Sequence, residues 1–309
     1  MKRIFCHLPL LCAAALLFYS GIASAGTDVD WASLNPALKG ATFVKSSAKC
    51  VQCHQEYIRK FAQTKMGRTL PNGGCEDCHG PMSKHLEAPR QQPPLVVSFT
   101  KTGGLTAAQK SSVCTQCHQD GIQINWQMSQ HALAGNTCTN CHNIMAVNDP
   151  VRNRATQPQV CFKCHQDKRA TINLRSHHPI RDGKVVCSDC HNPHGSPGPY
   201  QLAKNSVDET CYQCHPEKRG PFLWEHQPVR EDCTNCHNPH GSNQPRMLKV
   251  RQPFLCEQCH GEAYHPATLY SGTGIPPNGA AQQLLGRQCT NCHSMIHGSN
   301  HPSGSRFTR

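Results

Sequence analysis

The sequence predicts an elongated chain of short α-helices and loops with little or no β-sheet, wrapped around a core that aliphatic side chains do not supply. Three features of its composition lead to this expectation. The 309 residues are 37% hydrophobic and 6% aromatic, which is too little for a well-packed core at this length. The 23 glycines and 23 prolines interrupt regular structure, and the 22 cysteines and 21 histidines exceed ordinary usage. These counts argue against a large enzyme domain of the Rossmann or barrel type.

Residues 1–25 are expected to be a secretory signal peptide, which leaves a mature chain of residues 26–309. A positively charged start precedes an apolar run over residues 8–19, and small residues at 23–25 fit a cleavage site. The apolar run is short for a membrane-spanning helix. The sequence therefore predicts an exported protein, and two of the cysteines leave with the signal peptide.

The 20 cysteines of the mature chain all lie in ten C-x-x-C-H motifs. This motif attaches c-type haem. Its two cysteines lie on one helical turn, where each can form a thioether to a vinyl group, and the histidine that follows is the proximal ligand of the iron. The sequence therefore predicts ten covalently bound c-type haems, whose porphyrins provide the missing core. In chain order the motif residues are Cys50, Cys53 and His54; Cys75, Cys78 and His79; Cys114, Cys117 and His118; Cys138, Cys141 and His142; Cys161, Cys164 and His165; Cys187, Cys190 and His191; Cys211, Cys214 and His215; Cys233, Cys236 and His237; Cys256, Cys259 and His260; Cys289, Cys292 and His293.

Two other chemistries use many cysteines. Zinc sites need two cysteine pairs or additional histidines at closed spacing, and secreted proteins use cysteines as a disulfide framework. Neither gives a reason for a histidine directly after every pair, ten times in register. Both interpretations are therefore rejected in favour of haem attachment.

The motifs alternate between two types. Odd-numbered motifs have glutamine or lysine before the second cysteine, and even-numbered motifs have aspartate or asparagine. The string H-N-P-H-G-S at residues 191–196 recurs at 237–242. This pattern predicts five di-haem units in one continuous array, with two five-haem halves that divide near residue 175 as an alternative.

Two helix starts carry a capping-box pattern, a Ser or Thr followed three residues later by Glu or Gln. One begins at Thr106 and the other at Ser206, each shortly before an odd-numbered motif.

A second axial ligand for each iron must come from outside the motifs. The simplest expectation is that every iron has two histidine ligands, because the mature chain has ten further histidines. These are His85, His131, His177, His178, His194, His226, His240, His265, His297 and His301.

The repeat suggests a different set. Each unit offers one ligand position shortly before its even-numbered motif and one just after it. Met66 and Met145 occupy such positions where other units have histidine, so that His177 and His301 become surplus. The alternative is that both methionines only fill gaps in the packing. The expected distal ligands are Met66, His85, His131, Met145, His178, His194, His226, His240, His265 and His297.

The formal net charge of +12 does not indicate a nucleic-acid partner. Each haem brings two propionates, which offset the basic excess, and no block of like charges or basic–aromatic interleaving appears. We expect many basic side chains to neutralise propionates.

The second half of the chain resembles the periplasmic decahaem cytochromes of the MtrA/DmsE family, which includes the iron-oxidation types MtoA and PioA. The resemblance is carried by the strings at residues 191–196, 217–221, 224–226 and 296–304, and ten motifs at similar spacing extend it over the mature chain. It implies a row of haems inserted into an outer-membrane β-barrel porin, which connects periplasmic or inner-membrane cytochromes to an extracellular donor, acceptor or surface multihaem cytochrome. Ligation in the family is largely bis-histidine.

Met66 and Met145 depart from that pattern, and histidine–methionine ligation raises haem potential. The departure favours the iron-oxidising branch, with electrons moving inward from extracellular Fe(II) or an iron mineral. Outward transfer to metal oxides or to a sulfoxide reductase is the alternative. An alternative of another class is a multihaem reductase enzyme, such as a nitrite or hydroxylamine reductase. Catalysis at haem needs an exchangeable axial position, and the histidines are numerous enough to close every iron, so an electron carrier is expected.

Overall fold

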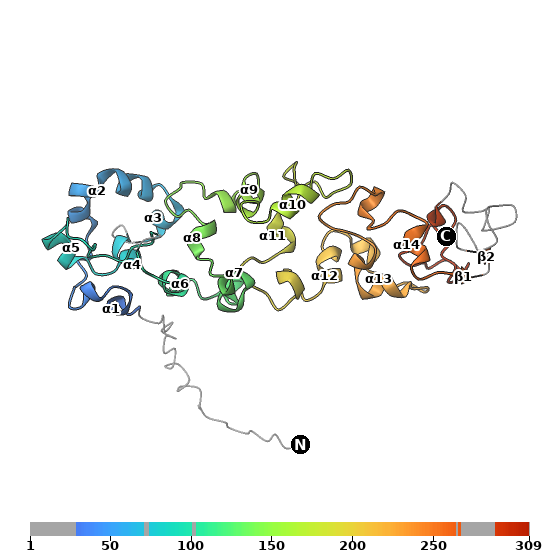
Figure 1. Ribbon diagram of the computed structural model, residues 1–309, viewed down its shortest axis with the longest axis horizontal. Coiled ribbons are helices and arrows are strands. Elements are labelled where there is room, and N and C mark those ends of the chain that lie inside the picture. Colours follow the sequence, from blue (N-terminus) through green and yellow to red (C-terminus); the bar gives the residue numbers. More distant parts are fainter. Residues whose placement is uncertain (1–28, 71–73, 101–102, 264, 267–287, 309) are drawn as a thin grey trace, which may run out of the picture.

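The computed structural model describes residues 29–70, 74–100, 103–263, 265–266 and 288–308. The expected signal peptide lies outside these residues. Figure 1 shows an elongated molecule in which the chain advances along the long axis in broad sequence order, with α1, α2 and α5 near one end and α14 near the other. Segments on the two long sides run roughly side by side, so the molecule has two rows of short helices rather than a layered core.

The described part of the chain is built from short helices and loops, as predicted. Its longest helix has 16 residues, and no described helix is long and apolar enough to cross a membrane. One two-residue antiparallel pair, β1 with β2, accounts for the strands. The elements are α1 (Trp31–Leu34), α2 (Ser47–Ala62), α3 (Lys65–Thr69), α4 (Cys75–His79), α5 (Ser83–Glu87), α6 (Ala107–Thr115), α7 (Gln130–Leu133), α8 (Cys138–Cys141), α9 (Gln157–Cys161), α10 (Gln166–Thr171), α11 (Cys187–Cys190), α12 (Val207–Tyr212), α13 (Gln227–Glu231), α14 (Phe254–Glu257), β1 (Glu262–Ala263) and β2 (His265–Pro266).

Proline and hydroxyl caps set where these helices begin. Proline stands at the first or second position of α9 and α13 and of 3-10 helices such as Pro199–Gln201 and Pro245–Met247. Its fixed φ suits a first turn, and its missing N–H is not needed there. The predicted capping box at Thr106 is confirmed, with bonds in both directions between Thr106 and Gln109. At Ser206 the hydroxyl accepts the backbone N–H of Glu209, which is one half of the box.

The aliphatic core is small. Leu38, Val97 and Val113 are almost fully buried and pack together near the N-terminal end of the array, with partly buried neighbours that include Trp31 and Phe99. This agrees with the low hydrophobic content, which cannot fill a core for a chain of this length.

Distant segments are joined by short backbone bridges. Ser176 pairs with Ser242, and Trp224 pairs with Ser299, each through two N–H···O bonds of 2.8 to 2.9 Å. Gly241 (φ +139°) lies against the carbonyl of Thr171, where a β-carbon would come within 2.2 Å of the oxygen. These contacts hold successive repeats of the chain in a fixed register.

Candidate haem sites

Each motif folds into one helical turn. In eight of the ten motifs the histidine N–H donates to the carbonyl of the first cysteine at 2.9 to 3.1 Å, and the other two motifs lie within α2 and α4. Residues three and four apart lie on the same side of a helical turn. The two cysteines and the histidine therefore face one side, as thioether attachment and proximal ligation require.

For reference, motifs are numbered 1 to 10 in chain order, and unit 1 to unit 5 denote residues 50–113, 114–160, 161–210, 211–255 and 256–309. Within every unit the side chains of the two first cysteines are in hydrogen-bonding contact. The hydrogen bond from its partner thiol lowers the pKa of Cys138, and the same contact lowers that of Cys187. Paired motifs therefore lie next to each other in each unit.

Motifs of successive units are also neighbours. The second cysteine of each of motifs 2, 4, 6 and 8 interacts electrostatically with a cysteine of the next motif along the chain. Contacts within units and between units therefore alternate, and the ten motifs follow one another in space in sequence order.

Seven motif histidines face a second histidine. The ring centroids are 6.0 to 6.4 Å apart. Two metal–imidazole bonds of about 2 Å, plus two nitrogen-to-centroid offsets of roughly 1 Å from standard bond lengths, place two trans imidazoles about 6 Å apart. The spacing therefore fits an iron between the rings. The pairs are His54 with His85, His142 with His194, His165 with His131, His191 with His240, His215 with His178, His237 with His297 and His260 with His226.

The pairs obey one rule. The histidine of motif 5, 7 or 9 faces a histidine from the preceding unit, and the histidine of motif 4, 6 or 8 faces one from the following unit. Neighbouring units thus exchange one partner in each direction. Motif 1 has no preceding unit, and its histidine faces His85 of its own unit.

Hydrogen bonds from Nδ1 fix the orientation of several rings. The His79 Nδ1–H donates to the Val97 carbonyl at 2.8 Å, and the His131 Nδ1–H donates to the Pro193 carbonyl at 2.9 Å. A donor proton at Nδ1 leaves the lone pair at Nε2, which is the form of imidazole that binds a metal. The residues present therefore fit haem ligation in their tautomer as well as in their spacing.

Burial keeps several of these histidines neutral. It lowers the pKa of His297 to about 4, with neighbouring cations adding to the effect, and it also lowers the pKa values of His85, His194 and His240. Since a metal ligand must carry no proton on the coordinating nitrogen, the packing favours the form that ligation needs.

Five residues considered in the sequence analysis are not part of the seven pairs: three expected ligands and two histidines expected to be surplus. Met66 is partly buried in α3, and Met145 follows motif 4 in a loop with 41% of its side chain exposed. The side chain of His265 lies outside the described set. His177 turns its Nδ1 to the Leu174 carbonyl at 2.6 Å, and His301 accepts the N–H of Ser303.

One functional contact was missed at the sequence level. The His142 Nδ1–H donates to a carboxylate, Asp149 Oδ2, at 2.7 Å. An aspartate seven residues after a motif histidine carries no sequence signal by itself, because the Nδ1 acceptors at motifs 2, 6, 8 and 10 are backbone carbonyls. At motif 7 the Glu217 carboxylate lies farther off, 3.7 Å from His215 Nδ1.

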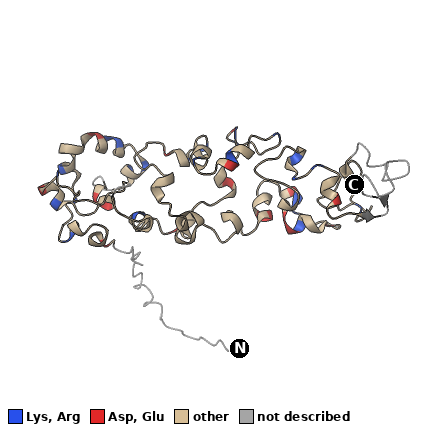
Figure 2. Cartoon of the chain, in the orientation of Figure 1, with Lys and Arg blue, Asp and Glu red and all other residues tan. Residues whose placement is uncertain are grey.

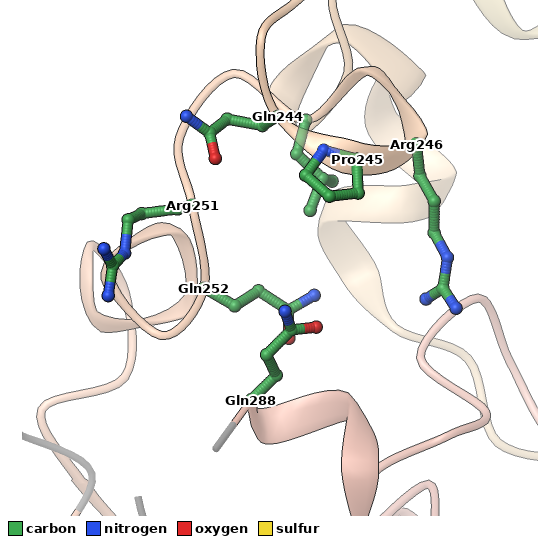
Figure 3. A pocket seen from close by; sticks show the side chains of 7 residues that line it. Gln244, Pro245, Arg246, Arg251, Gln252 and Gln288 are labelled. Carbon is green, nitrogen blue, oxygen red and sulfur yellow. The ribbon is translucent and has the colours of Figure 1, made fainter. Parts of the chain in front are cut away.

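A hollow with a volume of about 130 Å³ lies between units 4 and 5. Figure 3 shows arginine and glutamine side chains around it. Its lining is Gln244, Pro245, Arg246, Leu248, Arg251, Gln252 and Gln288, so it contains none of the expected ligands. Figure 2 shows basic and acidic residues mainly toward the two ends of the molecule, since residues 121–148 contain none.

Three family models match parts of the chain. A model described as a doubled CXXCH motif matches residues 177–220 and 226–265. A model described as cytochrome c-type protein NrfB-like matches residues 75–157, and one described as cytochrome c554 and c-prime matches residues 26–80. All three models concern c-type cytochromes or their motif.

The whole chain aligns with one relative from Shewanella baltica, the multiheme cytochrome MtrA, at 43% identity over 330 positions and 98% of that protein. The C-type polyheme cytochrome OmcB of Geobacter sulfurreducens is 24% identical over 94% of this chain and 36% of its own length. A cytochrome c-552 of Parabacteroides distasonis is 27% identical over 52% of this chain and 34% of its own length.

Proposed function

Because the chain belongs to the family of the multiheme cytochrome MtrA, we propose that it is a decahaem conduit that carries electrons across the outer membrane. It is an electron-transfer protein with covalently bound c-type haems. The observation that supports the finer proposal is the unbroken succession of motifs near enough to influence one another electrostatically, alternately within and between units from motif 1 to motif 10.

In this proposal all ten motifs hold haem, and the seven facing histidines are the distal ligands of the motifs that they face. The haem iron supplies reversible one-electron chemistry when bound. The side chains hold each of the seven ring pairs at a separation that would let both histidines bind one iron, which would exclude substrates from that iron and would suit a carrier rather than a catalyst. The division into five di-haem units belongs to the same proposal.

We propose that the mature protein is exported to the periplasm and sits inside an outer-membrane β-barrel porin. The elongated shape supports this, because a narrow rod can occupy a barrel that insulates it from lipid (Figure 1). Periplasmic cytochromes would contact one end, and an extracellular cytochrome, Fe(II) or an iron mineral the other.

The conduit is tested by reconstitution. We expect an intact mass with ten haems, and electron transfer from a reduced dye inside liposomes to soluble Fe(III) outside when the protein is inserted together with an outer-membrane β-barrel porin. Liposomes with porin alone are the control. Fully haem-loaded protein that gives no transfer with the porin would contradict the conduit, and a mass short of ten haems would contradict the stoichiometry.

We propose that electrons move inward from extracellular Fe(II), as in the MtoA and PioA types. The methionines at two ligand positions support this, because methionine ligation raises the potential of an iron. A potentiometric titration with a window that reaches above about −100 mV is expected. A window wholly below that value would favour outward transfer to metal oxides or a sulfoxide reductase.

A further inference from the structure

Neighbouring units exchange one histidine partner in each direction, and this pattern predicts which residues should face each other at the interface between units 1 and 2. At each of the three later interfaces two histidines cross, one in each direction, to face a motif histidine of the neighbouring unit. Applied to the first interface, the rule requires one residue of unit 1 to face His118 of motif 3 and one of unit 2 to face His79 of motif 2. Among the described residues no second histidine ring stacks on either of them.

The backbone around Met145 makes the same hydrogen bonds as the backbone around His194 and His240, two of the histidines that face a motif histidine of the preceding unit. The Asn143 side chain accepts the Met145 N–H at 3.2 Å. In the next two units asparagine accepts the N–H of His194 at 3.1 Å and of His240 at 3.3 Å in the same way. The following residue, Ala146, donates to the Asn143 carbonyl at 3.1 Å, as the glycines after both histidines do to theirs.

Met66 occupies the same kind of helix position as His131, which faces a motif histidine of the following unit. Each is the second residue of a short helix, α3 or α7. Each helix is capped by a buried hydroxyl, Thr64 at 1% exposure or Ser129 at 2%, which accepts the N–H three residues on at 3.0 or 3.1 Å. The match covers the cap, the helix position and the burial.

We propose that Met66 is the distal ligand of the haem at motif 3 and Met145 that of the haem at motif 2. Both histidine–methionine haems then lie at one interface and are adjacent in the array. Since methionine ligation favours reduced iron, electrons in a partly reduced protein collect on this pair, near the N-terminal end. The proposal rests on haem attachment at motifs 2 and 3, which the intact mass tests separately.

Near-infrared magnetic circular dichroism of the oxidised holoprotein tests the ligands. The wild type should show a methionine–iron charge-transfer band, and M66L and M145L should each remove about half of it while ten haems stay attached. The control is M128L, since Met128 is 79% exposed and stands at no ligand position. Absence of the band in wild type overturns the proposal, and a band unchanged in either variant overturns the assignment of that methionine.

The pairing is tested by removing one haem. The double variant C114S/C117S deletes the motif 3 haem and should lose the same half of the band as M66L, so that adding M66L changes nothing further. Removing the motif 5 haem in C161S/C164S should leave the band intact. An M66L effect that adds to the motif 3 deletion would overturn the pairing. If a deletion variant does not assemble, the leucine variants still decide the ligands.

A second inference comes from Asp149. At motifs 6 and 8 the histidine Nδ1–H and the next backbone N–H donate to two successive carbonyls, those of Tyr200 and Gln201 or of Arg246 and Met247. At motif 4 the two oxygens of one carboxylate replace them. Asp149 Oδ2 accepts from His142 at 2.7 Å, and Oδ1 accepts the Asn143 N–H at 3.1 Å.

We infer that Asp149 is a positioning residue that makes His142 a stronger electron donor to its iron than His191 and His237, which donate to carbonyls, are to theirs. A carboxylate acceptor raises the basicity of a ligating imidazole more than a carbonyl does, and its negative charge favours oxidised iron. The motif 4 haem then has a lower potential than those of motifs 6 and 8, next to the raised pair at the first interface.

In a potentiometric titration D149N should shift one of the ten potentials upward with all haems attached. The control is D167N, which removes a carboxylate two residues after His165 that is bonded to Lys168 at 2.9 Å rather than to a ring. An unchanged titration in D149N overturns the inference. The wild type alone offers a second test, because one bis-histidine signal in its electron paramagnetic resonance spectrum should have a narrowed g-spread, and its absence contradicts the inference.

Discussion

Replacing Gly241 by alanine is expected to open the sixth coordination position of the motif 6 haem. Gly241 follows His240, whose ring lies 6.0 Å from His191, and a β-carbon there would come within 2.2 Å of the Thr171 carbonyl oxygen and 3.1 Å of its carbon. The clash involves backbone, so the loop must move and withdraw His240. Positive φ and overpacking together should cost at least about 2 kcal/mol.

The measurement is carbon monoxide binding after reduction, together with the thermal midpoint. G241A should bind about one equivalent of carbon monoxide and melt at a lower temperature than wild type. The matched control is G183A, because Gly183 also has positive φ (+68°) but has no atom within 4 Å of an added β-carbon. It should lose some stability through strain and bind no carbon monoxide. Equal behaviour of the two variants would show that the Thr171 contact does not hold the ligand in place.

His178→Ala is expected to produce a large loss of conduction. The His178 ring lies 6.4 Å from His215, and its Nδ1–H donates to the Pro239 carbonyl at 2.8 Å. Without it the motif 7 haem should become accessible to carbon monoxide. Since the motifs contact one another in series, an altered potential at this haem slows every electron that crosses the array. The measurements are carbon monoxide stoichiometry and the rate of transfer across liposomes.

His177→Ala is the matched control, because His177 is the adjacent residue and also donates its Nδ1–H to a backbone carbonyl, that of Leu174 at 2.6 Å. In the described part of the chain, however, it is His178 and not His177 that faces the motif histidine His215. We expect no carbon monoxide binding and a rate close to wild type. The pair of variants also separates the two ligand sets considered from the sequence, one with all ten spare histidines and one with His177 surplus. Carbon monoxide binding in H177A, without binding in H178A, would reverse the assignment.

The helical turn that each motif forms could be predicted from the sequence because it is local. Ten histidines each directly follow a cysteine pair, and the geometry of one helical turn needs no tertiary contact. The fold class could also be predicted, since a chain with so few aliphatic residues and so many glycines and prolines cannot pack a conventional core. The elongated shape agrees with the repeat that H-N-P-H-G-S reveals at residues 191–196 and 237–242.

The partner of each motif histidine could not be predicted, because it is set by contacts between units. His194 lies three residues after His191 but faces His142, some fifty residues earlier. Nothing in the local sequence specifies this; the register between repeats does. The same holds for Gly241, which packs against Thr171, and for Asp149, whose role depends on a loop that turns back to His142.

The exchange of partners between neighbouring units has a consequence for how such arrays can grow. A whole unit inserted at an internal interface would receive one facing histidine from each neighbour and supply one to each neighbour. The pairing at all other interfaces would stay the same. The first unit differs because it supplies His85 to its own motif 1 and so closes the array at that end. With the ligands proposed above, a gene that duplicates internal repeats would lengthen the array by two haems for each added unit. A cut between any two of units 2 to 5 would instead separate one motif histidine on each side from the histidine that it faces.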